Sequence, residues 1–180
     1  MVRRDQPSPT DERTPRSRNS ERPVRPRGTA KDRALRLLGV RDRSRRELER
    51  RLLRTGFERE EIDEALDGLA AAGLIDDERF AAAVVEHSMT ARPSGRRAVM
   101  TSLLTKGVDR GVVERALERL EEGEEARADE LAERQAARLR ALDPAVAFRR
   151  LSSLLVRRGF SPGLAHAATR RALRVSDPQD

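Results

Sequence analysis

The sequence predicts an all-α fold of three tandem three-helix repeats, which form an elongated, curved array preceded by a disordered arm. Apolar residues recur at helical spacing through most of the chain, and no alternating β-branched run or hairpin turn indicates a strand. A basic stretch that ends at a glycine returns with a period of about 50 residues. Units of that length bury their apolar faces partly against their neighbours, which gives an elongated array.

The composition agrees with thin helical layers. Charged residues make up 38% of the chain and aromatic residues only 2%, with no Trp and no Tyr. A core built from Leu, Val, Ala and Ile with four Phe suits packed helices better than a deep β core.

Residues 1–29 are predicted to be the arm. They hold five prolines and eight arginines against four acidic residues, with almost no large apolar side chains. Such a segment cannot bury enough surface to offset the entropy lost on ordering. It is either an electrostatic tether for an anionic partner or an inert extension. The remaining chain carries 30 basic and 27 acidic residues, so any functional charge there depends on segregation.

Several kinds of chemistry are missing from the sequence. There is no cysteine, which excludes disulfides and thiolate sites. His87 and His166 fall in different repeats without a metal-binding spacing, and there is no GxxxxGK[ST] loop or GxSxG elbow. We therefore expect a protein that is not an enzyme and needs no cofactor or metal. Without a signal peptide or a long apolar run, we also expect a cytoplasmic protein that does not contact a membrane. We expect it to be a monomer.

The opening helix and the first repeat occupy residues 30–91. The opening helix ends near Gly39. Ser44 and Glu47 then form an S-x-x-E capping box at the start of SRRELERRLLRTGF, and Gly56 supplies the left-handed residue that ends this helix.

Two more helices complete the first repeat. The second has apolar residues at helical spacing and stops at Gly73; these residues are Ile62, Ala65, Leu66 and Leu69. The third begins within LIDDERFA, where Asp76 can cap it.

The second repeat occupies residues 92–142. A shift of 51 residues takes Leu52 and Gly56 onto Leu103 and Gly107. The apolar residues between 124 and 142 also recur at helical spacing, and we assign them to the third helix of this repeat.

The third repeat, residues 143–175, follows by a further shift of 52 and precedes a tail, residues 176–180. Asp143-Pro144 and Ser161-Pro162 each place an N-cap residue before a proline in the first helical position. Only two helices are clear in this segment, so the third repeat is expected to be truncated.

The first helix of each repeat is basic, whereas the second helix of the first repeat is strongly acidic. Two columns of residues recur in register: Arg46, Arg97 and Arg149, and then Thr55, Lys106 and Arg158. Arg46 lies about 200° around the helix from Leu48, so its column should face away from the core. Solvated helix faces often carry charge, but a single-sign stripe that repeats favours a repetitive anionic partner.

The motifs together resemble those of the RecX family of recombination regulators. They are SRRELERRLLRTGF, LIDDERFA, an R-x-x-G from Arg92 to Gly95, LLTKGVD and LVRRGF, and the resemblance covers about residues 32–174. It departs where family members often carry tyrosine, for instance at Arg43. The resemblance implies a non-enzymatic protein that binds along the groove of the RecA filament and inhibits its ATPase, strand exchange and coprotease activities.

The expected partners are therefore the RecA filament and, through the filament or weakly alone, single- or double-stranded DNA. The expected contact residues are the exposed cations of the three basic helices, namely Arg46, Arg50, Arg54, Arg96, Arg97, Lys106, Arg149, Arg150, Arg157 and Arg158.

Two alternatives remain open. A stand-alone DNA-binding protein could use the helix pairs as helix-turn-helix modules, but Glu58, Glu60 and Glu61 would place carboxylates where such modules meet DNA. A helical adaptor for another acidic partner fits the charge pattern as well.

Overall fold

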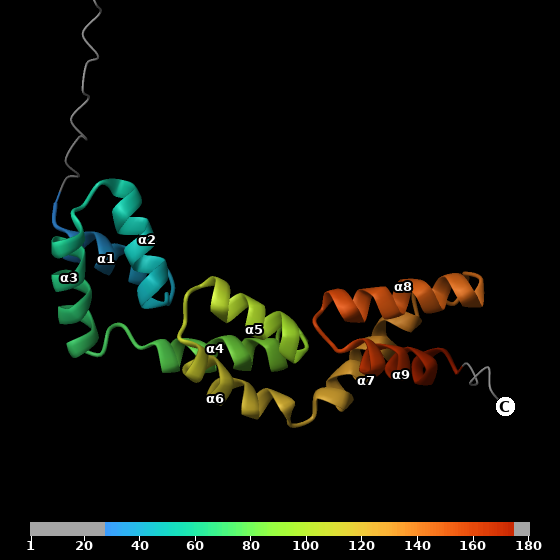
Figure 1. The fold of residues 1–180 in the computed structure, drawn as a ribbon. Coiled ribbons are helices and arrows are strands. Elements are labelled where there is room, and N and C mark those ends of the chain that lie inside the picture. Colours follow the sequence, from blue (N-terminus) through green and yellow to red (C-terminus); the bar gives the residue numbers. More distant parts are fainter. Residues whose placement is uncertain (1–27, 175–180) are drawn as a thin grey trace, which may run out of the picture.

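The computed structural model describes residues 28–174, and all its regular elements are helices (Figure 1). Residues 1–27 and 175–180 lie outside the described part, and with them most of the predicted arm and the whole tail. Thr29, assigned to the arm by the sequence, instead caps the first helix by accepting a hydrogen bond from the Asp32 N–H. The helices are α1 (Ala30–Leu38), α2 (Arg45–Thr55), α3 (Arg59–Ala71), α4 (Asp77–Met89), α5 (Arg96–Thr105), α6 (Arg110–Glu121), α7 (Glu124–Ala136), α8 (Pro144–Arg157) and α9 (Pro162–Leu173).

The helices pack as three units of three, each with its own apolar core: α1–α3, α4–α6 and α7–α9. The units follow one another along an elongated, curved molecule (Figure 1). This confirms the predicted all-α repeat fold. Among residues 28–174, no helix is long and apolar enough to cross a membrane.

The structure corrects the phase of the repeat. The sequence pattern predicts α4 in the first repeat and α7 in the second, but in the structure each is the first helix of the following unit. Ile75 closes the first core, whereas Phe80, Ala81 and Val85 on α4 belong to the second. A period found in a sequence fixes the length of the unit but not where the unit begins. The third unit is consequently complete, with α7 packed on α8 and α9.

Glycine ends the middle helix of each unit, as the sequence predicts. Gly56, Gly107 and Gly159 all have positive φ, of 92°, 80° and 91°. At the other end of α2, Ser44 accepts a hydrogen bond from the Glu47 N–H at 3.2 Å. The Glu47 carboxylate pairs with Arg41 at 2.7 Å.

The middle helices also join the three units. They lie head to tail along one side of the molecule in the order α8, α5, α2, which is the reverse of the chain order (Figure 1). The Gly95 N–H donates to the Arg158 carbonyl at 2.9 Å, and the Arg97 N–H donates to the Gly159 carbonyl at 3.2 Å. At the equivalent junction, the Ser44 hydroxyl donates to the Lys106 carbonyl at 2.6 Å. The negative end of each helix dipole thus meets the positive end of the next.

The glycines are needed for this close approach. A Cβ on Gly159 would lie 2.4 Å from both the Cβ and the backbone nitrogen of Ala98. A Cβ on Gly107 would lie 2.4 Å from Cγ of Arg46. Each glycine therefore ends one helix and leaves room for the next repeat.

Candidate functional site

A cavity of about 560 Å³ lies across the second unit, between α4 and α5. Arg41, from the loop before α2, and Arg157 and Arg158, from the end of α8, also line it. All three units contribute to its lining. The reason is that the head-to-tail junctions place the end of α8 beside the start of α5, and the end of α5 beside the start of α2.

Two further cavities adjoin the first. Arg92 and Arg158 line both the first cavity and the second, which extends along α7. Gln135 and Arg138 connect the second cavity to the third, which lies between α7 and α8. We call the three together the basic groove.

The charge of the basic groove is nearly all of one sign. Among the residues that line it, Asp42 is the only carboxylate. The cations are Arg41, Arg92, Lys106, Arg134, Arg138, Arg149, Arg150, Arg157 and Arg158. Arg41 and Arg134 pair with Glu47 and Glu130 from outside the lining, at 2.7 and 3.1 Å. The excess of guanidinium groups over carboxylates in the lining still favours an anionic ligand, because guanidinium groups bind phosphate and carboxylate oxygens through paired hydrogen bonds.

Five of the ten predicted contact residues line the groove: Lys106, Arg149, Arg150, Arg157 and Arg158. Arg149, Arg150 and Arg157 are exposed, while Lys106 and Arg158 are half-buried. The Lys106 ammonium donates to the Ser102 hydroxyl at 3.1 Å. Arg149, Arg150 and Arg157 belong to α8, and Lys106 and Arg158 are the C-cap residues of α5 and α8, which the structure brings together end to end.

The predicted residues of α2 lie nearer the first junction. Arg46 is exposed as expected, but it pairs with the buried Glu49 at 2.7 Å. Arg50 reaches across the junction and donates to the Thr105 carbonyl at 2.9 Å. Arg54 is exposed and donates to the carbonyl of Arg50 within the same helix.

The two predicted arginines at the start of α5 have different environments. Arg97 is exposed, and its backbone N–H forms part of the second junction. The side chain of Arg96 instead holds α5 against α6 of its own unit, because its Nε donates to Glu121 at 2.6 Å. Its backbone N–H donates to Glu124 of α7, in the third unit, at 2.8 Å. The side chain of Arg96 therefore points away from the groove cations.

Sequence reasoning missed four cations of the groove, namely Arg41, Arg92, Arg134 and Arg138. Arg92 was visible in the R-x-x-G motif, and Arg134 and Arg138 are four residues apart near the end of a helical pattern. None of the four belongs to the basic middle helices, so a search for a basic stripe on those helices could not include them.

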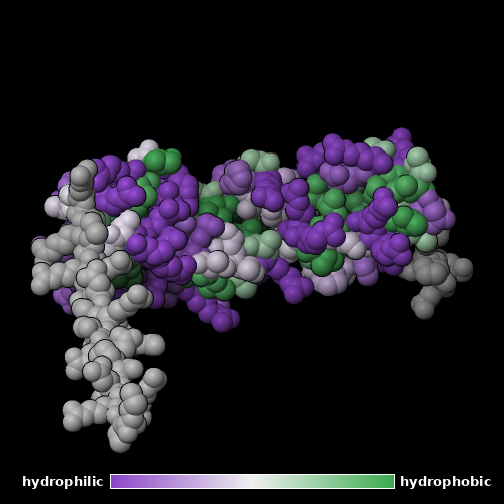
Figure 2. Space-filling view, turned by 90° about the horizontal axis from the view of Figure 1, so that it is seen from above, coloured by the Kyte–Doolittle hydropathy of each residue, from purple (hydrophilic) through white to green (hydrophobic). Residues whose placement is uncertain are grey.

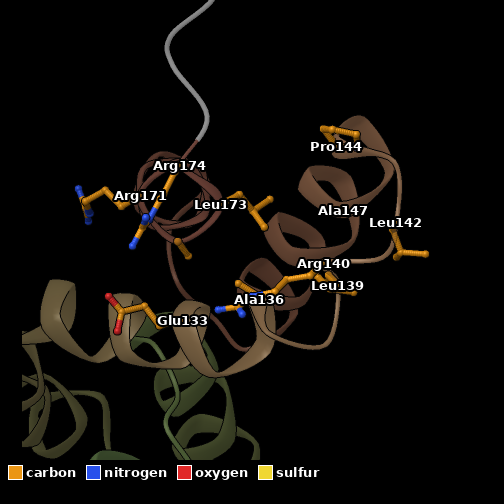
Figure 3. Close-up of a pocket in the computed structure, with 11 residues that line it drawn as sticks. Glu133, Ala136, Leu139, Arg140, Leu142, Pro144, Ala147, Arg171, Leu173 and Arg174 are labelled. Atoms are coloured by element: carbon orange, nitrogen blue, oxygen red, sulfur yellow. The ribbon is translucent and has the colours of Figure 1, made fainter.

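A separate cavity of about 750 Å³ lies at the far end of the third unit (Figure 3). Arg171 and Arg174 line it from the α9 side, and Pro144 and Ala147 line it from α8. Arg171 already pairs with Asp129 at 2.8 Å and with Glu125 at 2.9 Å. Because this cavity shares only Leu139 with the basic groove, we do not include it in the site.

The face that carries α2, α5 and α8 is mainly hydrophilic, with hydrophobic patches between the polar side chains (Figure 2). The aromatic rings contribute little to the surface of the described part. Phe57, Phe80 and Phe160 are buried, and the ring of Phe148 lies 5.7 Å from that of His166. The stacking platforms of single-strand binders are therefore missing from residues 28–174.

The first two units match known domains. Residues 30–69 match the RecX first three-helix domain, and residues 76–117 match the RecX second three-helix domain. These ranges agree with the packing units α1–α3 and α4–α6.

Whole-chain relatives extend the match. Regulatory protein RecX of Amycolatopsis mediterranei (strain U-32) is 37% identical over 81% of this chain and 83% of its own length. Regulatory protein RecX of Mycobacterium avium (strain 104) is 41% identical over 73% of this chain and 77% of its own length. The crystal structure of RecX from Lactobacillus salivarius has the same fold, with a TM-score of 0.68 at 23% identity over 81% of this chain and 96% of that one. By sequence and fold, the chain belongs to the RecX family of regulatory proteins.

Proposed function

We propose that this protein is a non-enzymatic regulator that binds the RecA nucleoprotein filament and inhibits its ATPase, strand exchange and coprotease activities. The observation that carries the proposal is the basic groove, which joins cations from all three units in a member of the RecX family. RecA is inferred as the partner from the resemblance of the motifs, and the groove supplies a physical reason for an anionic partner.

A nucleoprotein filament suits this groove because it is anionic and periodic. The nucleic acid contributes a phosphate charge at regular intervals, and contacts to it release counterions. A rigid array with cations from α5, α7 and α8 can contact several such charges at once. Binding through many weak contacts gains affinity without a single deep pocket.

Inhibition does not require a catalytic group in this protein. A ligand that binds one conformation of a filament better than another shifts the filament toward the conformation it prefers. An array that spans neighbouring filament subunits would therefore lower ATP turnover by restricting the motion between those subunits.

We propose a contact set for this function. It keeps the predicted cations except Arg96, whose half-buried side chain holds α5 against α6 through Glu121, and adds three from the groove. Arg41 and Arg46 also pair with carboxylates, Glu47 and Glu49, but their side chains are exposed. The set is Arg41, Arg46, Arg50, Arg54, Arg92, Arg97, Lys106, Arg138, Arg149, Arg150, Arg157 and Arg158.

The test is the DNA-dependent ATPase of RecA on single-stranded DNA, titrated with wild-type protein and with the double variant Arg149→Glu and Arg157→Glu. The wild type should inhibit, and the variant should need at least about tenfold more protein, since each reversed charge removes a favourable contact and adds repulsion. The matched control is Arg33→Glu with Arg119→Glu, two exposed arginines that do not line the groove. The proposal fails if the wild type leaves the ATPase unchanged.

Binding to DNA alone separates this function from that of a stand-alone DNA-binding protein. The basic groove is compatible with either. A dedicated DNA binder would bind duplex or single strands tightly without RecA, with a steep loss of affinity as salt rises. We expect weak binding to free DNA and much tighter binding to the filament.

A further inference from the structure

One exposed apolar side chain recurs at the same position in each of the three middle helices. Leu53, Leu104 and Val156 follow one another at intervals of 51 and 52 residues, which is the repeat period. Their exposed fractions are 38%, 41% and 39%. The residues before them, Leu52, Leu103 and Leu155, are fully buried in their own cores. We call the three exposed side chains the apolar row.

The apolar row is more than scattered surface hydrophobicity. In the described part of the chain, the large hydrophobic side chains counted as exposed also include Leu35, Val40 and Leu74, which share no repeat position. Half of this group therefore falls at one position of the repeat. Single exposed apolar residues are normal on a soluble protein, but three in register indicate a shared role.

Each member of the row shares a helix face with an arginine. Arg46, Arg97 and Arg149 each precede a row residue by seven positions, which is close to two turns, so the pair lies on one side of the helix. Because α8, α5 and α2 lie head to tail, basic and apolar side chains alternate along the molecule. The order is Arg149, Val156, Arg97, Leu104, Arg46 and Leu53.

This combination suits a protein surface better than nucleic acid. An apolar centre and arginine side chains are both typical of the buried core of protein interfaces. A phosphate backbone offers nothing for Leu or Val to bury, and single-strand binders use exposed aromatic rings, which the described face lacks. The arginines add charge complementarity toward carboxylates that border the apolar site of the partner. Of the three, Arg46 also pairs with Glu49 of its own helix.

We propose that the apolar row is the surface that contacts the protein subunits of the filament, with each repeat engaging an apolar site bordered by carboxylates on a successive subunit. This inference rests on the proposed function and divides the binding surface of the protein into two parts. The row binds protein, while the basic groove supplies contacts to anionic groups, including the nucleic acid.

The experiment measures two affinities for each variant: one for RecA filaments held on single-stranded DNA by a non-hydrolysable ATP analogue, and one for the same DNA alone. The row variant is Leu53→Gln with Leu104→Gln, because Gln keeps the length and the helix propensity of Leu. The control is Leu35→Gln with Leu74→Gln, two leucines of similar exposure, 40% and 48%, outside the row. Circular dichroism and thermal unfolding verify that both variants are folded.

We expect the row variant to bind filaments at least about tenfold more weakly than the wild type, because two apolar contacts in the buried core of the interface are replaced by polar groups. The control should bind filaments like the wild type, and neither variant should change the affinity for DNA. Adding Val156→Gln to the row variant should weaken filament binding further.

The outcomes separate this inference from the proposed function. If the wild type binds no filament, the proposed function fails and the inference fails with it. If the wild type binds and the row variant binds equally well, only the inference fails.

Three other results would give the row a different role. Equal losses of filament affinity in the row and control variants would show a non-specific apolar effect, and a parallel loss of DNA affinity would assign the row to nucleic acid. A change confined to self-association in sedimentation velocity would assign it to a second copy of the chain. Each of these three results would overturn the proposal.

Discussion

The hydroxyl oxygen of Ser44 lies 2.6 Å from the carbonyl oxygen of Lys106, 62 positions further along the chain. It donates its proton to that carbonyl and accepts a hydrogen bond from the Glu47 N–H at 3.2 Å. One buried side chain therefore caps α2 and joins the first repeat to the second.

Replacing Ser44 with Ala should remove both functions. We expect a loss of about 2 kcal/mol in the free energy of unfolding, of which about 1 comes from the cap and about 1 from the lost hydrogen bond between repeats. Urea denaturation measures the change. Ser161→Ala is the control, because Ser161 is exposed and caps only α9, through the Leu164 N–H. It should cost about 1 kcal/mol. Equal losses for the two variants would show that the bond to Lys106 contributes nothing.

Gly159→Ala should separate the third repeat from the second. The new Cβ would meet the backbone nitrogen of Ala98 at 2.4 Å, and the residue has φ of 91°. The backbone on both sides must move, so we expect a loss above about 3 kcal/mol or an independent, earlier unfolding of the third unit.

Gly73→Ala is the matched control for this prediction. Gly73 also has a positive φ, of 68°, but a Cβ there would meet nothing within 4 Å. Only the backbone penalty should remain, about 1 kcal/mol. Comparable losses in thermal unfolding for the two variants would mean that the close approach at the junction is not important.

The sequence predicts the helices and the period well, because both depend on local signals. Ser44, Asp76 and Ser161 cap helices where the pattern places them, and Gly56, Gly107 and Gly159 end them. The phase of the repeat depends on which faces meet. The apolar pattern of α4 is the same whether it packs on α3 or on α6, so the pattern could not decide between these partners.

The site could be predicted only in part for a related reason. The arginines of α5 and α8 were found because they belong to a repeated basic helix. Arg134 of α7 and Arg138, in the turn that follows α7, join them only because α7 lies alongside α8 in the third unit, which is a result of packing. The junction bonds also could not be foreseen, since in each of them the acceptor is a backbone carbonyl, which leaves no side-chain pattern.

Glu47 makes the stability of the first unit depend on pH. Burial raises the pKa of Glu47, but the hydrogen bond and charge of Arg41 and the backbone N–H of Ser44 outweigh it, so the pKa lies below its ordinary value. A carboxyl group with a lowered pKa stabilises the fold above its unfolded pKa of about 4.3, and this stability is lost as the pH falls through the folded pKa.

Glu47→Gln should therefore lower the melting temperature at pH 7, with a difference of at most about 1 kcal/mol for a partly exposed pair. The difference should shrink as the pH falls below about 4, where the wild type loses the same charge. Glu114→Gln is the control, because Glu114 is exposed beside Arg110 and should change stability by less than about 0.5 kcal/mol. A Glu47→Gln deficit that stays constant down to pH 2 would contradict this account.

Arg43 should be a site where the native residue lowers stability. Its side chain is buried, its Nε donates to the Leu37 carbonyl at 3.2 Å, and its Nη1 has no hydrogen-bond partner. Burial, with the nearby charges of Arg41 and Arg51, lowers the pKa of Arg43, which shows that the surroundings disfavour its charge.

Arg43→Met keeps the apolar stem and removes the buried charge. We expect a gain of about 1 kcal/mol in the free energy of unfolding, because the relief of desolvation exceeds the loss of one hydrogen bond to a partly exposed carbonyl. Arg33→Met, at an exposed position on α1, should stay within about 0.5 kcal/mol of the wild type. Urea denaturation of the wild type and the two variants measures these changes in the free energy of unfolding. A loss of more than about 1 kcal/mol at Arg43 would mean that the guanidinium group supports the loop between α1 and α2, whose neighbouring Arg41 lines the basic groove.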